Sequence, residues 1–314
     1  MTDTTGIPVV DFSAYSLSRS SPDDTGIENL IEDVHNALAS IGFLYLVNHG
    51  IPQSEIDNAF TQSRKFFELP KDVKMKYKRP DKSSNHGYVE CEREKLNPER
   101  PGDIKECFNY VPRDATGRMP DGELPEFTKC AVNFYDQCKQ LSNRVLEVMA
   151  RGLNLEDPYL FVKAHEGIGG PHSDTAMRFL YYPPVPENVE VNQIRCGEHS
   201  DYGSITLLFQ DSQGGLEVRA KNGEFIPATP IDGAIVLNIG DLMQRWTSDK
   251  LVSTVHRVVV PESEEAKRSL RRSIAFFHHP DNTHVVTCVD GSNKYPPITN
   301  DVYLQQRFSA TYKY

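Results

Sequence analysis

The stretch His199-Ser-Asp-Tyr-Gly-Ser-Ile-Thr-Leu-Leu-Phe209 combines a polar tripeptide, a turn and an apolar run. A short apolar run next to turn residues predicts a buried β-strand over 204–209. In an extended segment, side chains two residues apart point the same way. His199 and Asp201 can therefore bind one metal ion together, held in place by the strand that follows them.

Further short runs surround this stretch and resemble it in length and apolar content. Turn residues such as Pro183-Pro184 and Gly214-Gly215 separate them. Several strands at this spacing predict an all-β barrel or sandwich. The runs cover residues 178–182, 204–209, 216–219, 234–239, 255–260 and 273–277.

The first half of the chain has a different pattern, which predicts a mixed α/β region. Apolar residues recur at helical spacing in three segments, and β-prone runs lie between them. We therefore expect an N-terminal α/β region, 1–153, packed on a barrel domain, 154–314, whose motifs fall within about 175–280. The expected helices are 27–41, 53–69 and 126–153, the expected strands are 7–12 and 43–47, and 78–103 is expected to be a long irregular stretch.

Composition narrows the class of protein. The 314 residues carry a net charge of −10, which argues against a nucleic-acid partner. No apolar stretch approaches the ~20 residues of a membrane span, and the first residues do not resemble a secretory signal. The six cysteines are scattered and are expected to be free thiols. These features predict a soluble, cytoplasmic protein with no membrane partner, either a monomer or a weak homo-oligomer.

A third metal ligand must come from elsewhere in the chain. His256 is well placed because it begins another expected strand. Two histidines and one carboxylate leave open positions on the metal, as in non-haem Fe(II) oxygenases. A zinc hydrolase could use the same three ligands. His172-Ser-Asp174 repeats the tripeptide, but it lies in a glycine-rich loop, so we favour His199 and Asp201.

A possible anion-binding pair follows His256. Arg271 and Ser273 share one face of an expected strand. A guanidinium matches a carboxylate, the hydroxyl adds a donor, and Tyr182 could donate to the same anion. Because a buried, unpaired charge is costly, Arg271 inside a barrel needs an anionic partner. A metal beside a carboxylate-binding pair suggests a chelating keto acid as co-substrate.

The chain resembles the isopenicillin N synthase-like branch of the Fe(II)/2-oxoglutarate-dependent oxygenases over most of its length. The individual motifs are modest signals, but together, in this order and spacing, they are highly specific. The similar segments are Ile7-Pro-Val-Val-Asp11, Gly42-Phe-Leu-Tyr-Leu-Val-Asn-His-Gly50, Lys65-Phe-Phe-Glu-Leu-Pro70, Asp103-Ile-Lys-Glu106, Tyr181-Tyr-Pro-Pro184, His199-Ser-Asp201, Gly214-Gly-Leu216, Asn238-Ile-Gly-Asp241, His256-Arg-Val258 and Arg271-Arg-Ser273.

The resemblance implies a double-stranded β-helix, or jelly-roll, core flanked by N-terminal and C-terminal helices. It also implies Fe(II) on His199, Asp201 and His256, and the C5 carboxylate of 2-oxoglutarate on Arg271 and Ser273, with Tyr182 nearby. Plant members often carry Asn where this chain has Leu180, so one co-substrate contact is expected to differ.

The implied activity uses 2-oxoglutarate and O2 to oxidise, most simply to hydroxylate, a small organic molecule, with release of succinate and CO2. Relatives that carry Arg-x-Ser without using 2-oxoglutarate leave a second possibility open, an oxidase that closes rings or desaturates. A non-catalytic jelly-roll binding protein is a third.

The substrate itself is only broadly indicated. The barrel half resembles fungal thymine dioxygenase-like sequences, which favours a small heterocyclic or secondary-metabolite substrate. His278 and His279 end the strand after Phe277; one of them could approach the pocket, but a surface or hydrogen-bonded position is the simpler expectation for both. Expected lining residues are Tyr88, Phe108, Tyr110, Tyr202 and Phe277.

Overall fold

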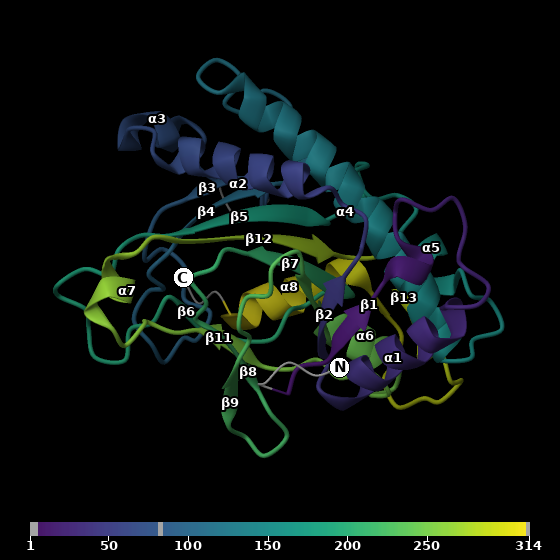
Figure 1. The fold of residues 1–314 in the computed structure, drawn as a ribbon. Helices are drawn as coiled ribbons and strands as arrows, with labels where there is room; N and C mark the ends of the chain where they lie inside the picture. The colour runs from purple at the N-terminus through teal and green to yellow at the C-terminus, as the bar shows by residue number, and fades with distance from the viewer. Residues whose placement is uncertain (1–5, 81–83, 312–314) are drawn as a thin grey trace.

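The computed structural model describes residues 6–80 and 84–311, which form two facing β-sheets with helices packed against the larger one (Figure 1). All neighbouring strands in the larger sheet are antiparallel except β1 and β2. Its eight strands have the order β1 (Val9–Asp11), β2 (Phe43–Val47), β10 (Ile235–Ile239), β7 (Ile205–Gln210), β12 (Arg271–His278), β5 (Ala176–Tyr182), β4 (Glu106–Tyr110) and β3 (Gly87–Val89).

The smaller sheet completes the core. Its strands have the order β6 (Cys196–His199), β11 (His256–Val258), β8 (Leu216–Arg219) and β9 (Phe225–Pro227). A two-stranded ladder of β13 (Val285–Val286) and β14 (Ile298–Thr299) lies apart from both sheets. The two facing antiparallel sheets are the jelly-roll core that the family resemblance implied.

Helices cover the face of the larger sheet that points away from the smaller one (Figure 1). The main ones are α1 (Ile27–Ser40), α2 (Gln53–Phe67) and α4 (Pro125–Gly152), and each buries one apolar stripe. Shorter helices are α3 (Lys71–Lys76), α5 (Leu160–Lys163), α6 (Asp241–Trp246), α7 (Glu264–Arg268) and α8 (Asn300–Thr311), with 3-10 turns at Ser13–Tyr15 and Pro112–Asp114.

The larger sheet separates two apolar cores, as strand alternation requires. In β5, Met177 and Phe179 pack toward the helices, whereas Leu180 and Tyr182 face the smaller sheet. The second core is small, and it surrounds the space between the sheets. That space is where the polar motifs converge.

The first half of the chain contributes strands to the larger sheet. β2 pairs with β10, and β4 pairs with β5. The expected irregular stretch 78–103 holds β3 in its described part, and residues 81–83 lie outside the described residues. The division at residue 153 stays a prediction.

The cysteines and the helices bear on two expectations drawn from the composition. All six cysteines are free thiols, as predicted. Within the described ranges, no helix has both the length and the apolar character needed to cross a membrane.

Candidate active site

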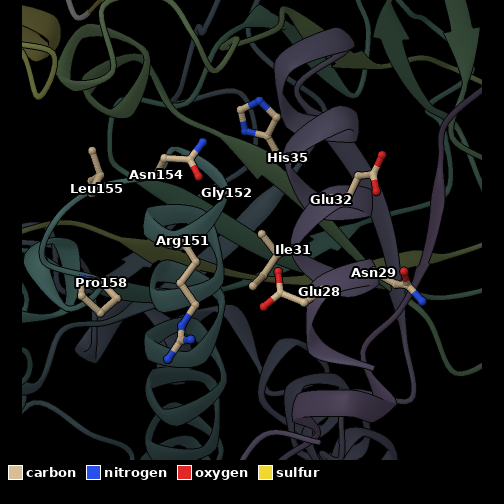
Figure 2. A pocket seen from close by; sticks show the side chains of 10 residues that line it. All are labelled: Glu28, Asn29, Ile31, Glu32, His35, Arg151, Gly152, Asn154, Leu155 and Pro158. Carbon is tan, nitrogen blue, oxygen red and sulfur yellow. The ribbon is translucent and has the colours of Figure 1, made fainter. Parts of the chain in front are cut away.

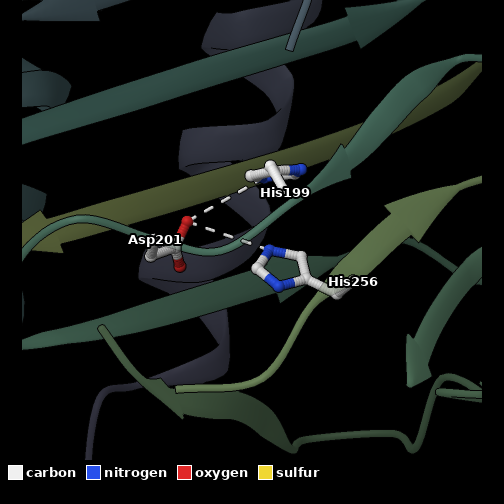
Figure 3. Close-up of side chains that lie close together, drawn as sticks. All are labelled: His199, Asp201 and His256. Atoms are coloured by element: carbon white, nitrogen blue, oxygen red, sulfur yellow. Dashed lines mark ion pairs between the residues drawn. The ribbon is translucent and has the colours of Figure 1, made fainter. Parts of the chain in front are cut away.

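The smaller sheet brings the two histidines together. His199 ends β6 and His256 begins β11, and they are direct partners in the antiparallel ladder. Asp201, two residues after His199, points toward both imidazoles (Figure 3). Its Oδ1 lies 3.9 Å from Nε2 of His199 and 3.8 Å from Nε2 of His256. The three ligand atoms all lie within 4.8 Å of one another.

Backbone carbonyls orient both imidazole rings. Nδ1 of His199 is 2.7 Å from the oxygen of Gly197, and Nδ1 of His256 is 3.1 Å from the oxygen of Thr254. Because a carbonyl oxygen can only accept, both Nδ1 atoms carry the proton. The Nε2 lone pairs are therefore free for a metal ion, an arrangement typical of metal-binding histidines.

Asp201 is held in a similar way. Its Oδ2 accepts hydrogen bonds from Oγ1 of Thr206 at 2.6 Å and from Nδ2 of Asn238 at 2.7 Å, which leaves Oδ1 facing the histidines. Burial by itself raises the pKa of Asp201. The neighbouring imidazoles and the two hydrogen bonds outweigh this effect and hold the pKa below its ordinary value. The carboxylate is therefore ionised and ready to bind a cation.

The donor set fits ferrous iron. Burial, and the adjacent His256, lower the pKa of His199 to about 3, so its imidazole is a neutral ligand at physiological pH. Two nitrogen donors and one oxygen donor are characteristic of non-haem Fe(II) sites, which keep open positions for co-substrate and O2. Across residues 6–80 and 84–311, no other group of three such side chains has donor atoms that converge in this way.

The competing tripeptide does not form such a centre. His172 is exposed, and Asp174 forms an ion pair with Arg113 at 2.6 Å. The choice of His199 and Asp201 over this pair is confirmed, because their donor atoms converge with that of His256 and the strand that His199 ends, β6, pairs with the strand of His256.

A buried guanidinium lies on the opposite wall of the same space. Arg271 in β12 is 1% exposed; its Nε donates to the oxygen of Gly214 at 2.6 Å. Its Nη1 lies 3.4 Å from Oγ of Ser273, and its guanidinium lies 4.7 Å from the ring centre of Tyr182. No carboxylate in the described part of the chain forms an ion pair with Arg271. A buried charge without a counter-ion indicates an anion-binding position.

One cavity connects this guanidinium with the metal ligands. It has a volume of about 60 Å³, and its walls include the triad together with Tyr182, Arg271 and Ser273. That volume would hold several water molecules, so the cavity is not a packing defect. Leu180, directly opposite Ser273 in the ladder, also lines it and presents an apolar wall.

A second cavity, of about 80 Å³, shares His199, Asp201 and Arg178 with the first as lining residues. Two aromatic residues expected there, Tyr202 and Phe277, do line it. Arg178, Asn85 and His279 line it as well. Sequence reasoning did not assign a role to Arg178, although the two-residue period from Tyr182 and Leu180 would have placed it on the same face.

Contacts with neighbouring side chains fix the position of Arg178. Its Nε donates to Oδ1 of Asn109 at 2.7 Å, and its Nη1 lies 3.2 Å from Oε2 of Glu94. Its guanidinium also lies 5.7 Å from the ring centre of Phe277. The cation is therefore held rigidly at the edge of the second cavity.

Three aromatic residues expected in the pocket lie elsewhere. Tyr88, Phe108 and Tyr110 pack in the core beneath the helices and do not line either cavity. The physical reason is strand alternation. In β4, Cys107 faces the smaller sheet, so Phe108 and Tyr110 cannot.

A wider groove of about 710 Å³ lies between α1 and the end of α4 (Figure 2). Glu28, Glu32, His35 and Arg151 are among its lining residues, and none of the metal ligands is. The groove is open and, among the described residues, holds no converging set of metal donors. The chemistry lies in the two smaller cavities between the sheets.

Two family models match the chain. Residues 7–126 match the model described as non-haem dioxygenase in morphine synthesis N-terminal, and residues 173–280 match the 2OG-Fe(II) oxygenase superfamily. The second match contains all three metal ligands and both residues of the Arg-x-Ser pair.

Similar proteins include fungal enzymes of known sequence and solved structure. A 2-oxoglutarate-Fe(II) type oxidoreductase, ppzD, of Metarhizium rileyi is 32% identical over 98% of this chain and 91% of its own length. The proline hydroxylase buaE of Petromyces alliaceus is 34% identical over 81% of this chain and 82% of its own. The crystal structure of a full-length Neurospora crassa protein in complex with alpha-KG and thymine has a TM-score of 0.85 and 36% identity, covering 99% of this chain and 98% of that one.

Proposed function

Since the chain belongs to the 2OG-Fe(II) oxygenase superfamily, and is a dioxygenase dependent on Fe(II) and 2-oxoglutarate, we propose that it hydroxylates a small planar heterocycle. The reaction is coupled to conversion of 2-oxoglutarate into succinate and CO2. The iron is held by His199, Asp201 and His256.

The observation that carries this proposal is the burial of Arg271 without a carboxylate partner, among the described residues, in the cavity that contains the triad. Arg271 binds the C5 carboxylate of 2-oxoglutarate, and Ser273 and Tyr182 add hydroxyl donors. The charge of the co-substrate supplies the missing counter-ion. Because one cavity is lined by Arg271 and by the metal ligands, a single chelating keto acid can contact both.

The bound iron supplies the activation of O2, and the residues of this chain supply geometry and water exclusion. The carbonyls of Gly197 and Thr254 hold the protons on Nδ1 of the two histidines. Thr206 and Asn238 keep Oδ1 of Asp201 directed at the metal position. Apolar walls, including Leu180, Leu216 and Val258, limit the water near the reacting groups.

The second cavity supports the substrate class. Tyr202 and Phe277 offer ring surfaces, and Arg178 and Asn85 offer hydrogen-bonding groups. A flat ring that bears carbonyl or amide groups satisfies both kinds of contact. The Neurospora crassa structure with thymine, from a protein 36% identical to this chain, supports the same class.

The co-substrate assignment is tested with two neighbouring arginines. Arg271→Gln should raise the KM for 2-oxoglutarate by at least about 30-fold, because a buried charge pair loses one partner. Arg272→Gln is the matched control, since Arg272 points to the other face and pairs with Asp211. Equal effects of the two substitutions on this KM would overturn the assignment of Arg271.

The reaction is tested by measuring succinate released per O2 consumed, with thymine and uracil as probes. Substrate-dependent succinate in a ratio near one supports the proposal. Oxygen consumption without succinate would instead identify the same-fold oxidase that acts without 2-oxoglutarate.

A further inference from the structure

His279 is fixed at the edge of the second cavity by contacts that do not involve its ring. It follows β12 directly, and its backbone N–H donates to Oγ1 of Thr175 at 3.0 Å. The same hydroxyl donates to the oxygen of His279 at 3.1 Å. Thr175 is fully buried, so the backbone of His279 has little freedom. The His279 residue is 9% exposed and lines the cavity with Tyr202 and Phe277.

The two ring nitrogens of His279 have different surroundings. Nδ1 is sealed from solvent and forms no hydrogen bond in the described part of the chain. A Cβ atom on Gly203 would lie 2.7 Å from this nitrogen, so the backbone of Gly203 closes that side of the ring. Nε2 also has no protein partner among the described residues, but it is not sealed. Only Nε2 can therefore reach a molecule in the cavity.

Two neighbouring buried histidines, His165 and His278, do not line this cavity. His165 has both nitrogens near hydrogen-bonding atoms, the oxygen of Phe161 at 2.6 Å and Oγ of Ser204 at 2.9 Å. The ring centre of His278 lies 4.4 Å from that of His165; both nitrogens of His278 are buried without a hydrogen-bond partner among the described residues, but His278 does not line the cavity. Of these three histidines only His279 lines the cavity, so its Nε2 is the unsatisfied ring nitrogen that a bound molecule can complete.

We propose that His279 is a specificity-determining residue whose Nε2 forms a hydrogen bond with a polar ring atom of the substrate. The proposal rests on the proposed function and names the feature that the substrate must carry, a carbonyl or ring N–H group. Arg178 and His279 both line the cavity with the aromatic residues, so they recognise polar atoms on the rim of a ring whose faces contact Tyr202 and Phe277.

The test uses two substitutions that place one amide group at different positions. His279→Gln puts an amide near the position of Nε2, and His279→Asn puts it near that of Nδ1. With thymine as the probe, His279→Asn should lower kcat/KM for coupled succinate release by about 10-fold or more, as expected for a lost hydrogen bond to an unsatisfied group. His279→Gln should stay within about 3-fold of the native enzyme, whereas the KM for 2-oxoglutarate changes in neither variant.

Controls separate binding from folding. His172→Asn alters an exposed histidine outside both cavities and should leave thymine turnover unchanged. The visible band formed on anaerobic addition of Fe(II) and 2-oxoglutarate should be equal in all variants, which reports an intact metal and co-substrate site.

Each remaining outcome overturns a distinct claim. Equal losses of kcat/KM in His279→Asn and His279→Gln would indicate that His279 acts only through packing and would rule out the proposed hydrogen bond. Native turnover in both variants would remove His279 from the substrate site and leave the proposed function standing. A native enzyme that forms the band but releases no succinate with thymine or uracil would overturn the substrate class, and the role of His279 with it.

Discussion

Arg307, in the last helix, forms an ion pair with Asp241 in which Nη2 and Oδ2 lie 2.8 Å apart. The same carboxylate accepts hydrogen bonds from Oγ of Ser200 at 3.0 Å and from Oγ of Ser253 at 2.6 Å. Ser200 lies between two iron ligands, and Ser253 precedes the third. The guanidinium of Arg307 also lies 4.9 Å from the ring centre of Tyr202. Helix α8 is thereby joined to both ligand segments and to a wall of the substrate cavity.

Substitutions of Asp241 and of Arg307 should affect stability and substrate binding to different extents. Asp241→Ala should lower the free energy of unfolding by about 1–3 kcal/mol, because three donors lose their acceptor. Arg307→Gln should lower it by less than about 1 kcal/mol, since the pair is partly exposed. The Arg307→Gln variant should instead raise the KM for the substrate, because Tyr202, which lines the substrate cavity, loses its contact with the guanidinium. Urea unfolding and steady-state kinetics measure the two effects, and equal losses of stability would contradict this division.

The residues that hold Asp201 should control iron affinity. Thr206→Val removes the hydroxyl that donates to Oδ2 and keeps the side-chain shape. Loss of such a contact to a metal ligand should weaken Fe(II) binding by about 10–100-fold, measured by competition with a chelator. Thr61→Val is the matched control, because its hydroxyl bonds only the oxygen of Asp57 on α2. An unchanged affinity in Thr206→Val would show that Asp201 needs no such support.

Glu94 should matter for stability and for substrate binding together. It is buried, and its Oε2 lies 3.2 Å from Nη1 of Arg178 and 3.5 Å from Nζ of Lys105. Burial would raise its pKa, but these two cations, together with Arg79, lower the pKa to about 2. Glu94→Gln leaves both cations without this counter-charge and should cost about 3–5 kcal/mol of stability.

The same substitution should raise the KM for the substrate, because Arg178 loses an anchor. Glu198→Gln is the control, since Glu198 pairs with Arg100 and Arg257 in a more exposed position. Its effect on substrate KM should be small. A larger effect there than in Glu94→Gln would contradict the placement of Arg178 in the substrate site.

The stability of the metal-free protein should fall in mild acid through His165. Burial lowers the pKa of His165 to about 3, below its ordinary value near 6.5. Between these two values the unfolded chain binds a proton that the folded chain does not. The free energy of unfolding should therefore decrease as pH falls from 6.5 toward 3, by up to about 1.4 kcal/mol per pH unit for this group.

The measurement is urea unfolding between pH 6.5 and 4.5 for the native protein and for His165→Gln. The variant lacks the titrating group, so its stability should depend less steeply on pH over this range. His172→Gln serves as the control with an exposed histidine. If the free energy of unfolding depends on pH equally in the native and His165→Gln proteins, buried His165 is not the cause of the loss of stability in mild acid.

Helices and strands with a strong apolar period were predictable from the sequence. The segment 27–41 was expected to be helical and α1 spans Ile27–Ser40, while β2 at Phe43–Val47 has the bounds expected for it. β6 was missed, because Cys196-Gly-Glu-His199 carries no apolar alternation. It becomes a strand by pairing with β11, and local propensity contains no signal for that contact.

The order of residues along the chain was enough to predict the chemical groups of the site: two histidines and an aspartate, then an arginine and a serine two residues apart. The sequence also favoured His199-Ser-Asp201 over His172-Ser-Asp174, because the first tripeptide leads into an apolar strand. Which aromatic side chains face the cavities became evident only from the folded chain, as did the absence of a carboxylate partner for Arg271 among the described residues. The reason is physical. A residue type is a local property, whereas the face on which it lies, and the charges beside it, depend on pairing between strands far apart in the chain.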